Sequence, residues 1–120
     1  MGRIHFIEYQ GKAILLEDFT NLGYGQEFLD NIALAQKIIA NQPAHSVLAL
    51  FDATHSTFNS QVLSTMKDFT RANSPYIKCS AVVGIRGFLN VALFAVRKAS
   101  RRPFYTFPTR QAALDFLVKQ

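Results

Sequence analysis

The sequence predicts one α/β domain over residues 1–120, with a mixed, mostly parallel five-stranded sheet and helices packed on it. Three observations support this fold class. The chain opens with two strand-like segments joined by a turn, and apolar runs follow at 46–51 and within 76–83. Segments with helical spacing of apolar residues alternate with those runs. A length of 120 residues fits one domain, and no repeat or linker divides the chain.

The first two strands are expected at residues 3–9 and 12–19, which are rich in Ile, Leu and aromatic residues. Gln10 and Gly11 lie between them. Glycine readily adopts the positive φ that a tight hairpin turn needs, so the pattern predicts an antiparallel hairpin.

The first helix is expected at about residues 24–41, because four apolar residues recur there at intervals of three and four. These residues are Phe28, Ile32, Ala35 and Ile39. A second helix is expected at about 59–73. The strand at 46–51 is continuously apolar, which is typical of a strand buried on both faces, and the next strand is expected at 76–83, which is apolar through residues 81–83.

The last third of the chain completes the order β-β-α-β-α-β-α-β-α. A third helix is expected at about 88–99, followed by a short strand at 104–107. Pro103 favours an edge position for that strand, because proline cannot donate a ladder hydrogen bond. Thr109 is expected to cap a final helix.

The composition excludes several classes of protein. Charged residues make up 18% of the chain and hydrophobic residues 49%, so a packed core is expected rather than disorder. The net charge of +5 favours acidic partners, but no recognisable nucleic-acid-binding motif is present, so nucleic-acid binding is not expected. No signal peptide is expected, because polar residues interrupt the N-terminus. No apolar stretch approaches the roughly 20 residues of a membrane span.

Cysteine and histidine usage points away from metal and redox chemistry. The single Cys79 cannot form an intramolecular disulfide and is typical of a reducing compartment, so a cytoplasmic location is expected. Within its predicted strand, Cys79 is interpreted as a small buried hydrophobe. His5, His45 and His55 lack the spacing of a ligand set, so neither a metal nor a cofactor is expected.

Several segments, together with the order of the elements, resemble one known family. They are residues 3–6 with 11–14, 46–52, 58–62, 75–84 and 112–119. The resemblance is to the STAS domains, which include bacterial anti-sigma-factor antagonists and cytoplasmic domains of sulfate transporters. It is strongest to the stand-alone, antagonist-like bacterial members and covers essentially the whole chain.

The resemblance implies a regulatory domain whose protein contacts are switched by phosphorylation at the start of the second helix. Ser60 is the hydroxyl that matches the family's Asp-Ser-Ser-Gly-type motif, where Asn59, Gln61 and Val62 replace its other residues. A phosphate there adds nearly two negative charges and spoils the fit to a partner. From the residue types alone, Asn59 and Ser60 are also ordinary residues for a helix start.

A polar loop follows the strand at 46–51, where open α/β sheets usually bind ligands. Its candidate ligand residues are Asp52, Thr54, His55, Ser56 and Asn59. Asp52 and His55 are suited to proton transfer, but no catalytic signature frames them. The alternative is turn chemistry, in which Asp and Thr side chains bond to the nearby backbone.

The third helix carries more apolar surface than a helix on a sheet requires. Its apolar arc is about 200° wide, whereas a stripe slightly over 100° is enough, and Phe94 lies outside the arc. The excess either packs internally or faces a partner. The candidate interaction surface comprises Phe88, Val91, Phe94, Arg97, Lys98 and Arg101. The basic residues also suit a solvated helix C-terminus.

The sequence therefore predicts a non-catalytic regulatory binding module that contacts an unidentified protein. A homodimer through one repeated patch also fits the wide apolar arc. The first alternative is a lipid or small-ligand binder, with an anionic lipid or another small ligand beside the third helix. The second alternative is an enzyme that uses Asp52 and His55.

Overall fold

A computed structural model describes residues 2–120, and the elements within them follow the predicted order. Every predicted boundary lies within two residues of the observed one. The elements are β1 (Ile4–Tyr9), β2 (Lys12–Asp18), α1 (Gln26–Ala40), β3 (Val47–Asp52), α2 (Ser60–Asn73), β4 (Ile77–Val83), α3 (Phe88–Ser100), β5 (Tyr105–Phe107) and α4 (Arg110–Leu117).

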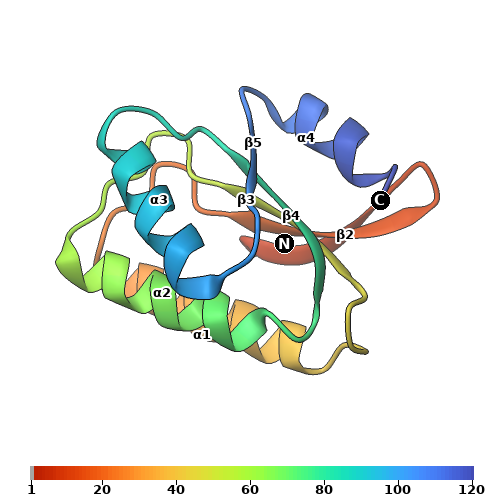
Figure 1. Cartoon of the computed structure of the whole chain (residues 1–120), viewed down its shortest axis with the longest axis horizontal. Coiled ribbons are helices and arrows are strands. Elements are labelled where there is room, and N and C mark those ends of the chain that lie inside the picture. Colours follow the sequence, from red (N-terminus) through yellow and green to blue (C-terminus); the bar gives the residue numbers. More distant parts are fainter. Residues whose placement is uncertain (1) are drawn as a thin grey trace.

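The strands form one sheet in the order β1-β2-β3-β4-β5. β1 and β2 pair antiparallel, as predicted, and the other neighbouring pairs are parallel. Gln10 and Gly11 take φ values of 49° and 83° in the hairpin turn. Each parallel connection advances one strand in the same direction. Right-handed crossovers therefore place α1, α2 and α3 on one face of the sheet, and α4 covers the other (Figure 1).

The larger core lies between the sheet and the pair α1 and α2. The four predicted apolar residues of α1 are all buried there. Phe19, which directly follows β2, stacks on Phe51 with ring centres 4.6 Å apart and meets the edge of Phe28 at 5.8 Å. These contacts hold the carboxyl ends of β2 and β3 against α1.

The opposite face of the sheet is covered by α4. Ala113 and Leu117 are fully buried against residues of β2, β3 and β4. Thr109 caps this helix as predicted, because its Oγ1 accepts a hydrogen bond from the Ala112 N–H at 3.2 Å. Cys79 is a buried free thiol in this core, which agrees with the prediction of a small hydrophobe.

Helix α3 lies beside α2 and is less deeply packed than the other helices of its layer (Figure 1). Val96 and Ser100 are its buried residues. Leu89, Ala92 and Leu93 are partly buried and line a cavity that α3 encloses together with α2 and the sheet.

Candidate functional site

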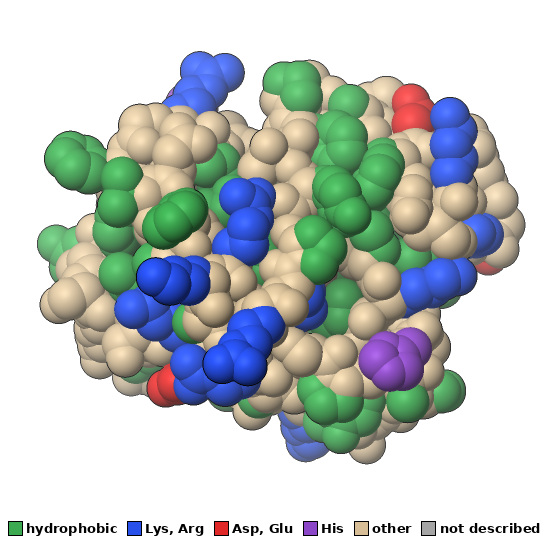
Figure 2. Space-filling model, viewed as in Figure 1, with side chains coloured by type: hydrophobic (Ala, Val, Ile, Leu, Met, Phe, Trp, Pro, Cys, Tyr) green, Lys and Arg blue, Asp and Glu red, His purple; other side chains and the backbone are tan. Residues whose placement is uncertain are grey.

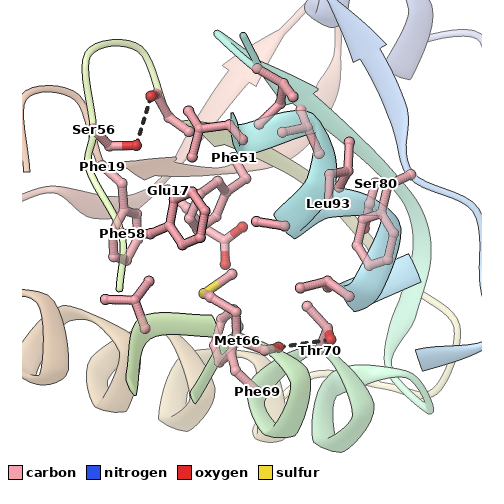
Figure 3. Close-up of a pocket in the computed structure, with 18 of the residues that line it drawn as sticks. Glu17, Phe19, Phe51, Ser56, Phe58, Met66, Phe69, Thr70, Ser80 and Leu93 are labelled. Atoms are coloured by element: carbon pink, nitrogen blue, oxygen red, sulfur yellow. Dashed lines mark hydrogen bonds between the residues drawn. The ribbon is translucent and has the colours of Figure 1, made fainter. Parts of the chain in front are cut away.

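The cavity between the sheet, α2 and α3 has a volume of about 110 Å³ and is almost entirely apolar (Figure 3). Its walls include Phe19, Phe51 and Val82 from the sheet layer, Val62, Met66 and Phe69 from α2, and Leu89, Leu93 and Val96 from α3. Ligand pockets in proteins are typically concave and apolar with a few placed polar groups, and this cavity has that character.

Glu17 is the acidic side chain in this cavity, and it comes from near the carboxyl end of β2. Strand alternation places it on the same face as Leu15, beneath α1 and α2. Glu17 is only 4% exposed, and its Oε1 has no hydrogen-bond partner among residues 2–120. In Figure 3 its carboxyl group points into the cavity toward Met66. Burial raises the pKa of Glu17 to about 8 against the opposing charge of Arg102, so the group is mainly protonated at neutral pH.

Arg102, which lies between α3 and β5, provides a second polar group in the cavity wall. It donates from Nε to Ser74 Oγ at 3.1 Å and from Nη1 to Ser80 Oγ at 2.7 Å. Its guanidinium lies 4.5 Å from the centre of the Phe104 ring. Burial lowers the pKa of Arg102 to about 10, partly offset by Glu17, so the group stays charged at neutral pH. These contacts fix the guanidinium in the wall.

A second, more polar depression of about 430 Å³ opens outside the cavity, between the loop after β3 and the start of α3. Its lining residues from the predicted ligand loop are Thr54, His55 and Ser56. The depression and the cavity share Ser56, Thr57, Phe58 and Leu89 as wall residues. The inner cavity therefore lies directly behind the loop.

The five candidate ligand residues of this loop have different surroundings. Asp52 is buried, and its Oδ1 accepts from the N–H and hydroxyl of Thr54 at 3.0 and 2.6 Å. His55 is exposed, with a φ of 57°. Ser56 donates to the Ala53 carbonyl oxygen at 2.8 Å and is the member that also lines the inner cavity. The turn chemistry considered as the alternative is thus present at Asp52 and Thr54.

The same Asp-x-Thr turn ends the neighbouring strand β2. Asp18 Oδ1 accepts from the N–H and hydroxyl of Thr20 at 3.0 and 2.6 Å, and Asp18 is in register with Asp52. Arg110 of α4 forms ion pairs with both carboxylates. Its Nε lies 2.5 Å from Asp52 Oδ2, and its Nη2 lies 3.3 Å from Asp18 Oδ1. Burial raises the pKa of Asp18, but the bonds from Thr20 and Arg110 outweigh it and leave this pKa lowered. Both carboxylates are therefore occupied by protein groups.

The start of α2 matches the structural part of the prediction. Asn59 is the N-cap, and its side chain accepts from the Val62 N–H at 2.9 Å. Ser60 is the first residue of the helix and is exposed. A hydroxyl is therefore accessible at the position that the family resemblance singles out.

The outer face of α3 carries three large apolar side chains in solvent. Phe88, Val91 and Phe94 are 80%, 64% and 65% exposed, and their spacing of three residues places them on one side of the helix. Phe94, which lies outside the apolar arc of the helix, is thus in solvent and not in the core. Figure 2 shows hydrophobic side chains protruding over α3 with Lys and Arg side chains beside them. The basic residues Arg97, Lys98 and Arg101 are exposed at the end of the helix.

Glu17 and Arg102 were not among the candidate residues from the sequence. A signal for Glu17 was present, because it alternates with the apolar residues Leu15 and Phe19 along the predicted strand at 12–19. For Arg102 the sequence offers no comparable signal, since it lies in a basic run that is normally solvated.

Residues 2–120 contain no cluster of His, Cys, Asp and Glu that could hold a metal ion. Within the same residues, no helix has the length and apolar character needed to cross a membrane. Comparisons with protein-family models, curated proteins and solved structures gave no match for this chain.

Proposed function

We propose that this chain is a non-catalytic regulatory binding module that contacts an acidic protein surface through the outer face of α3. The observation that carries the proposal is the exposure of Phe88, Val91 and Phe94 on one side of that helix. Contiguous apolar side chains in solvent typically mark interaction sites, and aromatic residues are enriched among those that dominate binding energy.

The charge around this patch supports an acidic partner. Arg97, Lys98 and Arg101 form a basic rim at the end of α3, and the chain carries a net charge of +5. A basic rim steers an acidic surface toward the apolar centre and accelerates association at low ionic strength. The buried, unpaired Cys79 fits a reducing, cytoplasmic setting for this contact.

Phosphorylation of Ser60 belongs to the same proposal. The STAS resemblance implies a switch at this position, and the exposed hydroxyl at the start of α2 is accessible to a kinase. A phosphate at a helix N-terminus is stabilised by the free N–H groups and the helix dipole. The modification would therefore change the surface charge without unfolding α2.

An enzyme based on Asp52 and His55 has less support. The carboxylate of Asp52 is engaged by Thr54 on one oxygen and by Arg110 on the other. A general base must reach a substrate proton, and this carboxylate is already occupied within the fold.

The decisive comparison uses Phe94→Glu and the control Leu34→Glu, which alters an exposed apolar residue on α1. We expect the unmodified chain and the control to capture the same protein, and Phe94→Glu to lose it. Capture should also weaken in 1 M salt, where electrostatic attraction is screened within about 3 Å.

Circular dichroism of all three proteins checks the fold. Equal capture by Phe94→Glu would contradict the role of α3, and unfolding of this variant would show that Phe94 supports the core.

A second function, binding of a small ligand, is favoured by the Glu17 cavity on the inner side of α3.

A further inference from the structure

The Glu17 carboxyl group is the least compensated polar group in the core. It is buried in the sheet, and its Oε1 lacks a hydrogen-bond partner among residues 2–120. Buried polar groups in native proteins are nearly always paired, so an unpaired one calls for a specific explanation, such as a bound partner. The side chain projects into an apolar space and not into a packed wall (Figure 3).

Three hydroxyl groups around the cavity are hydrogen-bonded within the fold. Thr70 donates to the Met66 carbonyl oxygen at 2.8 Å, and Ser56 donates to the Ala53 carbonyl oxygen at 2.8 Å. Ser80 accepts from Arg102 at 2.7 Å. Glu17 Oε1, by contrast, is a buried atom without a hydrogen-bond partner among residues 2–120, so a guest molecule can pair with it.

The dimensions of the cavity limit the guest to a small molecule. Its volume is about 110 Å³. An engineered apolar cavity of about 150 Å³ binds benzene, so a guest no larger than a single ring is expected in this smaller cavity. The apolar residues of α2 and α3 around Glu17 would contact such a ring on several sides.

The chemistry of the site selects an uncharged polar group on that ring. A neutral carboxyl group can donate one hydrogen bond and accept another, which is the complement of a hydroxyl group. An ionised head would have to be desolvated in an apolar space, and a cation would also face the buried charge of Arg102.

We propose that the cavity binds a small, uncharged cyclic molecule whose single hydroxyl group pairs with the Glu17 carboxyl group. The loop wall at Ser56, Thr57 and Phe58, shared with the outer depression, is the side from which the ligand enters. The site lies on the inner side of α3, away from the exposed Val91 and Phe94, and is a different surface from the proposed protein contact.

The test compares phenol with benzene as probes, because the two differ by one hydroxyl group. Binding is followed by amide chemical shifts of the full chain during titration with each probe. We expect phenol to bind about tenfold more tightly, which corresponds to one additional satisfied hydrogen bond. The shifts should be centred on β2, α2 and the inner side of α3.

Two variants test whether Glu17 causes the tighter binding of phenol than of benzene. Glu17→Leu should bind both probes with equal affinity, because the hydroxyl has no partner there, and Glu17→Gln should keep the preference, because an amide also donates and accepts. Glu8→Gln changes an exposed residue of β1 and is the control. If Glu17→Leu fails to fold, Ala92→Phe fills the cavity from α3 and should abolish binding of both probes.

The proposal is overturned by equal affinity for phenol and benzene in the unmodified chain. Shifts confined to the outer depression, or the absence of binding at millimolar probe concentration, overturn it as well. None of these results bears on capture of a protein by Phe88 and Phe94, so the two proposals fail separately.

Discussion

At the scale of single residues, Glu17 is costly to the fold. An unpaired buried polar group costs about 1–3 kcal/mol, and an ionised one costs more. The fold avoids the larger cost because burial raises the pKa of Glu17 to about 8, which keeps the group protonated at neutral pH. The proton that Glu17 binds on folding links stability to pH.

Stability should therefore fall as the pH rises from about 4.5 to about 8. In this window the folded chain holds a proton on Glu17 that the unfolded chain, with an ordinary pKa of 4.5, has released. The slope from this group is at most about 1.4 kcal/mol per pH unit. Urea unfolding at several pH values measures it, and Glu17→Gln should lack this contribution.

Asp18 affects stability in a different range. Its pKa is lowered, so its contribution to stability is present above its ordinary value of 3.8 and is lost as the pH falls further. The two effects are separate in pH. An identical slope for Glu17→Gln and the unmodified chain between pH 5 and 8 would show that Glu17 ionises freely in the fold.

The burial of Glu17 shows what sequence patterns can and cannot establish. Alternation along β2 predicts that Leu15, Glu17 and Phe19 share one face. It does not predict that the helices above leave a space there, because that depends on the packing of α3 against α2. The strand itself was predictable, whereas the environment of one side chain in it was not.

At the scale of secondary-structure elements, Arg110 connects α4 to the ends of two strands. Its partners Asp18 and Asp52 are adjacent in the sheet, and Arg110 and Asp52 are 58 residues apart in sequence. Local spacing predicts helices and strands, but an ion pair between such distant residues depends on the sheet order. The elements were therefore predictable and this connection was not.

Arg110→Ala should destabilise the fold by about 2 kcal/mol. The Asp52 side chain is 5% exposed, so the variant would leave its buried negative charge without a cation. The loss of stability is moderated because Arg110 itself is partly exposed and its charge is screened by solvent. Arg71→Ala removes an exposed pair with Asp68 and should cost less than about 0.5 kcal/mol. Urea unfolding of both variants makes the comparison, and equal losses would mean that the pair with Asp52 is no stronger than a surface pair.

At the scale of the whole molecule, the exposed patch on α3 is small. Its three apolar side chains present roughly 400 Å² to solvent, as judged from typical side-chain areas. A stable protein interface buries about 800 Å² on each partner. A homodimer held by this patch alone would be weak, and a regulatory partner must also contact residues around α3.

Light scattering over a range of protein concentrations tests whether the homodimer is weak. We expect a monomer at micromolar concentration, with self-association only at much higher concentration and less of it in Phe94→Glu. A stable dimer at micromolar concentration that persists in Phe94→Glu would indicate an interface away from α3.

Helix α3 is a wall shared by two surfaces, since Leu89 and Leu93 face the cavity while Phe88, Val91 and Phe94 face solvent. A guest that favours one position of this helix changes the affinity for a partner by a certain factor. By thermodynamic reciprocity, the partner changes the affinity for the guest by the same factor. Binding of a guest in the cavity and binding of a partner to the exposed face would then both report the position of α3.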